Sequence, residues 1–169
     1  MKRVITIQDI SCVGKCSITT ALPIISALGI ETAILPTAVL SNHTQFDEFT
    51  CKNLEDQIEP ISDTWERLGI NFDGIYTGYL ASEKQIDLVI NFFYSFGKEG
   101  ILRFVDPAMA DDGKLYVSFD NDFPKAMARL CGNADIIIPN LTEACLMTDT
   151  EYTEKYDEKK IRELLYKLA

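Results

Sequence analysis

Histidine and closely spaced cysteines are scarce in this chain of 169 residues. It contains one histidine, His43, and five cysteines at irregular spacings, with no Cys-x-x-Cys pair. A structural zinc site needs several closely spaced Cys and His ligands, so this pattern argues against zinc. An odd number of irregularly spaced thiols does not indicate disulfides either, and we expect reduced thiols in a cytoplasmic protein.

Positive charge is also in short supply. The 16 Lys and Arg residues face 26 Asp and Glu residues, which gives a net charge of −10. Binding to nucleic acid requires clustered Lys and Arg that neutralise phosphates, so we expect no nucleic-acid partner. No apolar run approaches the roughly 18 residues of a transmembrane helix, and no long apolar signal segment follows Met1. We therefore expect no membrane partner.

Two common nucleotide-binding motifs are missing. No Gly-x-Gly occurs, which excludes the dinucleotide-binding fingerprint. The stretch Val13 to Ser17, VGKCS, looks like the end of a P-loop, but Asp9 stands where that motif needs its first glycine. Cys16 also replaces the Ser or Thr that would bind Mg²⁺. What remains is a glycine-containing turn before a helix, which either receives an anion or simply joins two elements.

The rest of the chain alternates short apolar runs with amphipathic segments. Hydrophobic residues make up 47% and charged residues 25%, as in ordinary globular domains. Apolar runs predict strands at residues 4–7, 32–35, 74–77, 102–105 and 136–138. Helical periodicity predicts helices at residues 17–28, 54–68, 122–130 and 157–168, and helices beginning at 82 and 140. This alternation indicates a single α/β domain over residues 1–169, with a mostly parallel sheet covered on both faces.

Several predicted helices have clear signals at their ends. Gly29 and Gly69 follow two of them and suit helix C-termini. Ser82, with Gln85 three residues later, has the spacing of a capping box. Residues 8–15, before the helix predicted at residues 17–28, are expected to form a loop.

The stretch from Leu102 to Tyr116, LRFVDPAMADDGKLY, organises the chain. Its apolar start predicts a strand buried on both faces. Asp106 and the proline after it end that strand, because proline cannot donate to a sheet. Asp111 to Gly113 then predicts a turn in which a glycine is available for positive φ. Asp106 either terminates the strand or lies where open α/β sheets bind ligands.

Every conspicuous polar loop follows a predicted strand. The loops are residues 9–15, 41–46, 77–79, 106–113 and 140–143. Right-handed crossovers bring the loops that follow parallel strands to one edge of the sheet. We therefore expect a site at that edge, with His43 and Asp106 on the same side.

Several residues in these loops could have either a structural role or a role in a binding site. Asn140 and Glu143 have capping-box spacing, and Glu143 could also hold Mg²⁺ or its waters beside Asp106. His43 is either a hydrogen-bonding loop residue or part of a site for a small polar heterocycle. Tyr79 either packs within its loop or flanks such a ring.

Four motifs together resemble a known family. SNHTQF, TGYL, DPAMADDGKLY and IIIPNLTEA, in this order and spacing, are similar to pyridoxal kinases of the ribokinase-like superfamily. The opening IQDISCVGKCSITTALPIISALGI looks like the bacterial pyridoxal/pyridoxamine kinase branch. The resemblance implies a three-layer α/β/α fold. It also implies transfer of the ATP γ-phosphoryl group to the 5′-hydroxymethyl group of pyridoxal, pyridoxamine or pyridoxine, in vitamin B6 salvage.

The resemblance also assigns residues and cofactors. It places the B6 vitamer against Asp9, His43, Thr44, Gln45 and Tyr79. It places ATP against Asp106, Asp111, Asn140 and Glu143, with Mg²⁺ at Asp106 and Glu143. Asp111 belongs to a lid-like loop over the nucleotide. Relatives of this kind also suggest a monovalent cation such as K⁺, and a homodimer in the full-length form.

The chain departs from the family pattern at several positions. Asp9 stands where many relatives have Ser, and Cys12 and Ala110 stand where they have Gly. The family's catalytic base lies in a Gly-Thr-Gly-Asp motif, yet no glycine in this chain is followed by Asp. We therefore expect an N-terminal portion of a kinase, inactive alone, with exposed apolar surface on its last helix and outermost strand. The alternatives are a hydroxymethylpyrimidine kinase and a non-catalytic module that binds a B6 vitamer or a partner.

Overall fold

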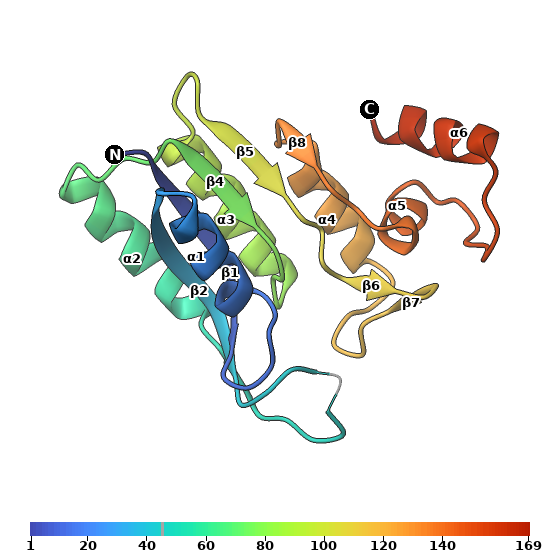
Figure 1. The fold of residues 1–169 in the computed structure, drawn as a ribbon, viewed down its shortest axis with the longest axis horizontal. Helices are drawn as coiled ribbons and strands as arrows, with labels where there is room; N and C mark the ends of the chain where they lie inside the picture. The colour runs from blue at the N-terminus through green and yellow to red at the C-terminus, as the bar shows by residue number, and fades with distance from the viewer. Residues whose placement is uncertain (45) are drawn as a thin grey trace.

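Six strands form one sheet in the order β3-β2-β1-β4-β5-β8 (Figure 1). The computed structural model describes residues 1–44 and 46–169. The sheet contains β1 (Arg3–Ser11), β2 (Glu31–Leu40), β3 (Cys51–Asn53), β4 (Gly74–Thr77), β5 (Leu102–Val105) and β8 (Ile136–Ile137). Neighbouring strands pair in parallel, except that β3 runs antiparallel to β2. The mostly parallel sheet predicted from the sequence is confirmed.

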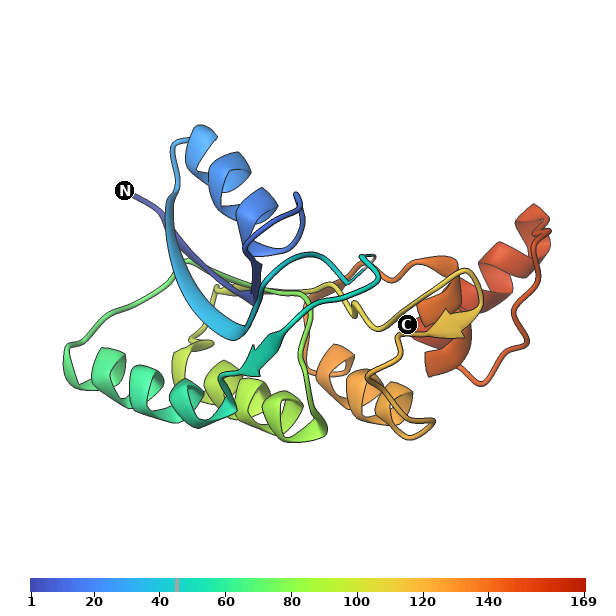
Figure 2. The ribbon, with the colours of Figure 1, turned by 90° about the horizontal axis from the view of Figure 1, so that it is seen from below.

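Helices lie on both sides of this sheet, but not evenly. The helices are α1 (Ile18–Ala27), α2 (Glu55–Arg67), α3 (Glu83–Phe96), α4 (Phe123–Cys131), α5 (Leu141–Met147) and α6 (Glu158–Leu168). Figure 2 shows α2, α3 and α4 under one face and α1 over the other, whereas α5 and α6 lie beyond the β8 edge. No helix in the described part of the chain is long and apolar enough to cross a membrane.

The hydrophobic core fills the face covered by α2, α3 and α4. Ile7 and Val105 point toward this face and are fully buried, together with Ile86, Val89 and Phe93 of α3. Side chains alternate between the two faces of a strand, so the adjacent positions point the other way. Burial of this one apolar face is therefore the main packing contribution to the fold.

The opposite face is less covered than predicted. Leu102 is 56% exposed and Ile136 is 40% exposed, so β5 is not buried on both faces, and that prediction is wrong. The physical reason is that α1 packs on β1 and β2 and leaves the β4-β5-β8 side of this face open (Figure 2). Tyr76 and Phe104 lie on this open part and pack edge to face, with ring centroids 6.1 Å apart.

The first strand continues beyond its predicted end. Residues 8–11 belong to β1 rather than to a loop, because pairing with β2 resumes at Ile10 and Val39 after an irregularity. Gln8 pairs with Pro36, which has no N–H to give to the ladder, and the register shifts directly after it. The sequence pattern underestimated this strand because three of residues 8–11 are polar, and their place in the sheet depends on pairing with β2.

Local signals at the helix ends are mostly confirmed. Gly29 and Gly69 have φ of 76° and 67°, as expected for residues that follow helices. The Ser82 side chain accepts a hydrogen bond from the Gln85 backbone N–H. The second half of that capping box is absent, because the Gln85 side chain instead accepts from the Ala81 N–H at 2.8 Å.

Gln85 is fully buried and joins three elements of the fold. Its Nε2 donates to the Thr37 carbonyl at 2.8 Å and to the Asn53 side chain at 2.7 Å. Together with the bond from the Ala81 N–H, these contacts fasten the loop after β4 to β2 and β3. One buried side chain thus makes hydrogen bonds to three segments of the fold.

The expected apolar exposure near the end of the chain is also present. Leu165 and Tyr166 of α6 are 59% and 80% exposed, and Ile136 and Ile138 at the outermost strand are exposed as well. Exposed apolar groups on the edge strand and on this helix form a surface that another protein segment could cover.

We predict that Gln85→Leu lowers the free energy of unfolding by about 1–3 kcal/mol, because the Ala81 N–H loses its partner and the Thr37 carbonyl keeps only its bond from the Leu54 N–H. Urea denaturation of this chain measures the effect. Gln57→Leu on α2 is the matched control, because Gln57 is exposed, and we expect it to change stability little. Equal effects of the two substitutions would contradict the assigned role of Gln85.

Candidate functional site

The loops that follow the parallel strands lie together, as predicted. His43 follows β2 and Asp106 follows β5, and both strands run parallel to β1 and β4. Their carboxyl ends therefore share one edge of the sheet. β1 lies between β2 and β4, so the strand order reverses direction there, which is where open α/β sheets bind ligands.

Asp9 lies within the irregular part of β1. It is only 4% exposed, and the Ser11 hydroxyl donates to its Oδ2 at 3.1 Å. Burial, and then the charge of Asp9, raise the pKa of the Cys51 thiol. Cys51 is thus a neighbour of Asp9 that the sequence did not reveal, because it belongs to the short antiparallel strand β3 that no pattern predicted.

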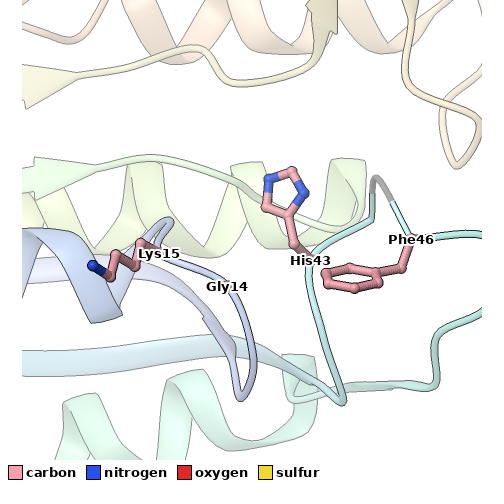
Figure 3. Close-up of a pocket in the computed structure, with 4 residues that line it drawn as sticks. All are labelled: Gly14, Lys15, His43 and Phe46. Carbon is pink, nitrogen blue, oxygen red and sulfur yellow. The ribbon is translucent and has the colours of Figure 1, made fainter.

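His43 lines a cavity of about 410 Å³ together with Gly14, Lys15 and Phe46 (Figure 3). The His43 N–H donates to the Val13 carbonyl at 2.9 Å, which joins the loops after β1 and β2. Gly14 has φ of 110°, and a methyl group there would lie 2.9 Å from the His43 Cβ. The close approach of the two loops therefore requires glycine. A cavity of this volume suits a small ligand.

The other residues that the resemblance assigns to the vitamer differ in how the structure places them. Thr44 is exposed next to His43. Gln45 lies outside the described residues. Tyr79 is half-buried, and its carbonyl accepts from the Thr37 hydroxyl at 2.9 Å. Burial raises the pKa of Tyr79, and the charges of Cys51 and Asp9 raise it further. Asp9, Cys51 and Tyr79 are therefore electrostatic neighbours at this edge.

Asp106 and Glu143 form the carboxylate side of the site. Asp106 is half-buried, and burial raises its pKa although a hydrogen bond with Tyr76 opposes this effect. Burial also raises the pKa of Glu143 to about 7, and the charge of Asp106 acts in the same direction. The two carboxylates are thus close enough to influence each other.

Glu143 completes a capping box with Asn140 at the start of α5. It is 3% exposed, its Oε2 accepts from the Asn140 N–H at 2.8 Å, and Asn140 Oδ1 accepts from the Glu143 N–H at 2.9 Å. Its Oε1 accepts from the Met109 N–H at 3.2 Å. The capping interpretation is confirmed, and the metal role of Glu143 stays a prediction.

The loop after β5 contains a hairpin that α5 holds in place. β6 (Ala110–Asp111) and β7 (Lys114–Leu115) are joined by Asp112 and Gly113, whose φ values are 47° and 77°, as in a type I′ turn. The Asn140 side chain donates to the Ala110 carbonyl at 2.8 Å, and Thr142 Oγ1 accepts from the Gly113 N–H at 2.9 Å. Asp111 is exposed on this hairpin. The turn was predicted, but its attachment to Thr142 was not.

The described residues contain no group of three or more His, Cys, Asp and Glu side chains that could hold a metal ion. Mg²⁺ is commonly bound by one or two carboxylates, with water and substrate phosphates as its other ligands. Asp106 and Glu143 fit that smaller donor set. They do not fit a metal held by protein ligands alone.

We predict that Glu143 makes stability fall as pH rises. Its folded-state pKa of about 7 exceeds the ordinary 4.5, so folding favours its protonated form. That stabilisation is complete below about pH 4.5 and is lost as pH rises through about 7. Relative to wild type, Glu143→Gln should therefore gain up to about 3 kcal/mol between pH 4 and pH 8.

Urea denaturation across this pH range measures the difference. Glu163→Gln is the control, because Glu163 is exposed on α6 and should leave the pH profile unchanged. Parallel profiles for wild type and Glu143→Gln would contradict the prediction.

Comparison with curated proteins identifies pyridoxal kinases as relatives. No protein-family model matches the chain. A pyridoxal kinase from Histophilus somni is 28% identical over 148 residues, which cover 85% of this chain and 52% of that protein. The pyridoxal kinase of Bos taurus is 24% identical and covers 99% of this chain and 56% of that protein. The chain thus spans about half the length of the curated relatives it matches.

Solved structures agree with this relationship. A protein from Bacteroides thetaiotaomicron, provisionally named phosphomethylpyrimidine kinase, has a TM-score of 0.96 and 40% identity, and one of its crystal forms contains pyridoxal. The match covers 99% of this chain and 58% of that one. Pyridoxal kinase from Lactobacillus plantarum has a TM-score of 0.90 and 31% identity, over 99% of this chain and 59% of its own. The chain is therefore a relative of the pyridoxal kinases and has an α/β, ribokinase-like fold.

Proposed function

We propose that this protein is part of a vitamin B6 kinase, which transfers the γ-phosphoryl group of ATP to the 5′-hydroxymethyl group of pyridoxal, pyridoxamine or pyridoxine. One observation carries the proposal. A cavity at His43 and the Asp106–Glu143 carboxylates lie at the same edge of a parallel sheet, in a chain related to pyridoxal kinases. The reaction requires an acceptor site beside a phosphate site, and open α/β sheets bind ligands at such an edge.

On the vitamer side, the chain supplies groups of the right chemistry for a substituted pyridine. Asp9 accepts hydrogen bonds and would face the ring, and His43 lines the cavity beside Lys15. Thr44, Gln45 and Tyr79 complete the proposed set. Tyr79 offers an aromatic face next to the charge of Asp9. These residues would bind and orient the vitamer, so that its hydroxymethyl group points toward the nucleotide.

On the nucleotide side, Asp106 and Glu143 would hold Mg²⁺ together with phosphate oxygens. Both oxygens of Glu143 already accept backbone hydrogen bonds, so we propose that it acts through water or through its charge. Asn140 and Asp111 flank the same loop and complete the proposed ATP set. The metal would neutralise charge on the transferred phosphoryl group when bound.

Several broader features belong to the same proposal. We propose a cytoplasmic enzyme that uses a monovalent cation such as K⁺ and forms a homodimer in its full-length form. We also propose that residues 1–169 form the N-terminal portion of a kinase domain, in a chain that spans about half the length of its relatives. The Gly-Thr-Gly-Asp base motif does not occur in this sequence, so the proton acceptor would be supplied from outside it.

A second candidate is a hydroxymethylpyrimidine kinase. The provisional name of the Bacteroides thetaiotaomicron protein favours it, although that protein crystallised with pyridoxal. Hydroxymethylpyrimidine, the substrate of this second candidate, lacks the phenolic oxygen of a B6 vitamer. Phosphorylation assays with ATP, each of the three vitamers and hydroxymethylpyrimidine, using a chain that includes the base motif, distinguish the two. We expect turnover of a vitamer, and turnover of the pyrimidine alone would contradict the B6 assignment.

We predict that His43→Ala weakens pyridoxal binding to this chain roughly 5- to 150-fold and leaves ATP affinity nearly unchanged. The reason is that a polar group of the vitamer would lose its partner, which costs about 1–3 kcal/mol. Titration calorimetry with each ligand measures both affinities.

Asn91→Ala is the matched control for this substitution, because Asn91 is exposed on α3 away from the cavity. Similar losses for pyridoxal and ATP would indicate general unfolding. Unchanged pyridoxal affinity in His43→Ala would remove this loop from the site.

A further inference from the structure

Tyr79 is held at two places by residues far away in the sequence. Its carbonyl accepts from Thr37 of β2, as described above. Its hydroxyl is hydrogen-bonded to the Ser118 hydroxyl at 3.3 Å, and its ring packs on Phe119, with centroids 5.6 Å apart and planes at 35°. The backbone of Tyr79 is thus fixed by the sheet. Its ring is fixed by the segment that follows the β6–β7 hairpin.

That segment is itself anchored at both ends. The Tyr116 N–H donates to the Met109 carbonyl at 2.9 Å, directly after the hairpin. Phe119 stacks on Phe123 with centroids 3.8 Å apart and planes at 9°, and Phe123 is a buried residue of α4. Ser118 is exposed and lies between these two anchors, which hold the chain on either side of it.

The same segment faces the carboxylate side of the site. Burial raises the pKa of Tyr116 to about 12, and the charges of Glu143, Asp111 and Asp106 raise it as well. Tyr79 acts on Tyr116 in the same direction. Residues 116–119 therefore reach both proposed sides: Tyr116 is near the carboxylates, and Ser118 and Phe119 contact Tyr79.

We propose that Ser118 is a positioning residue, which sets the Tyr79 ring against the vitamer without touching the vitamer itself. The proposal rests on the proposed function, because it takes Tyr79 as a wall of the vitamer site. Three observations support it: the hydroxyl pair, the Phe119 contact, and the anchoring of the segment at the hairpin and at α4. A serine that only contacts solvent would have no effect on the position of the Tyr79 ring.

The first test is a double-mutant cycle on pyridoxal binding. Ser118→Ala and Tyr79→Phe each remove one hydroxyl of the pair, and we expect each to raise the dissociation constant about 2- to 10-fold, the scale of one neutral hydrogen bond. The double variant should bind no more weakly than the weaker single variant, because the two changes remove one interaction. Ser118→Thr keeps the hydroxyl and should retain wild-type affinity. Ser95→Ala, exposed on α3, is the matched control.

The second test needs no vitamer. With 3-fluorotyrosine incorporated, Tyr79→Phe identifies the fluorine resonance of Tyr79 in the nuclear magnetic resonance spectrum. We expect this resonance to move in Ser118→Ala and to stay at the wild-type position in Ser118→Thr and Ser95→Ala. Thermal melting of each variant checks that the fold is intact.

The outcomes separate this inference from the proposed function. A moved resonance with weakened pyridoxal binding supports the positioning role. An unmoved resonance overturns it, and so does a moved resonance with unchanged affinity in a wild type that binds pyridoxal. If the wild-type chain binds no pyridoxal, the proposed function fails for this chain. The fluorine resonance then decides whether Ser118 positions Tyr79.

Discussion

Parallel pairing of β2, β1, β4, β5 and β8 is the constraint on which the site depends. Parallel strands begin at one edge of a sheet and end at the other, so residues far apart in the sequence meet where the strands end. Asp9, His43, Tyr79 and Asp106 reach the same region for this reason. The irregularity after Pro36 changes the register between β1 and β2 at Asp9.

Buried polar side chains then fix the loops that the sheet brings together. Gln85 fastens the loop of Tyr79 to β2 and β3, and Glu143 fastens the start of the β6–β7 hairpin to α5. Each makes several hydrogen bonds inside the protein, where an unpaired partner would be costly. The loops of the site are therefore held in place by side chains that need not contact a ligand.

The sequence predicted the elements whose signals are local, and missed those that depend on distant partners. β4 and β5 begin and end where predicted, and Asn140 with Glu143 forms the predicted cap. The extension of β1, the short strand β3 and the exposure of Leu102 depend on pairing and on which helices cover the sheet. Among the residues proposed for the site, Cys51 and Ser118 had no motif, since their roles come from contacts across the fold.

The central claim is that one edge of the sheet holds the vitamer and the nucleotide in adjacent places. Amide chemical shifts of the labelled chain, recorded during separate titrations with pyridoxal and with the magnesium complex of ADP, test it most directly. We expect pyridoxal to shift the amide resonances near residues 9–15, 41–46 and 79, and ADP to shift those near residues 106–113 and 140–143. Shifts at the opposite edge of the sheet, or identical residues for both ligands, would contradict it.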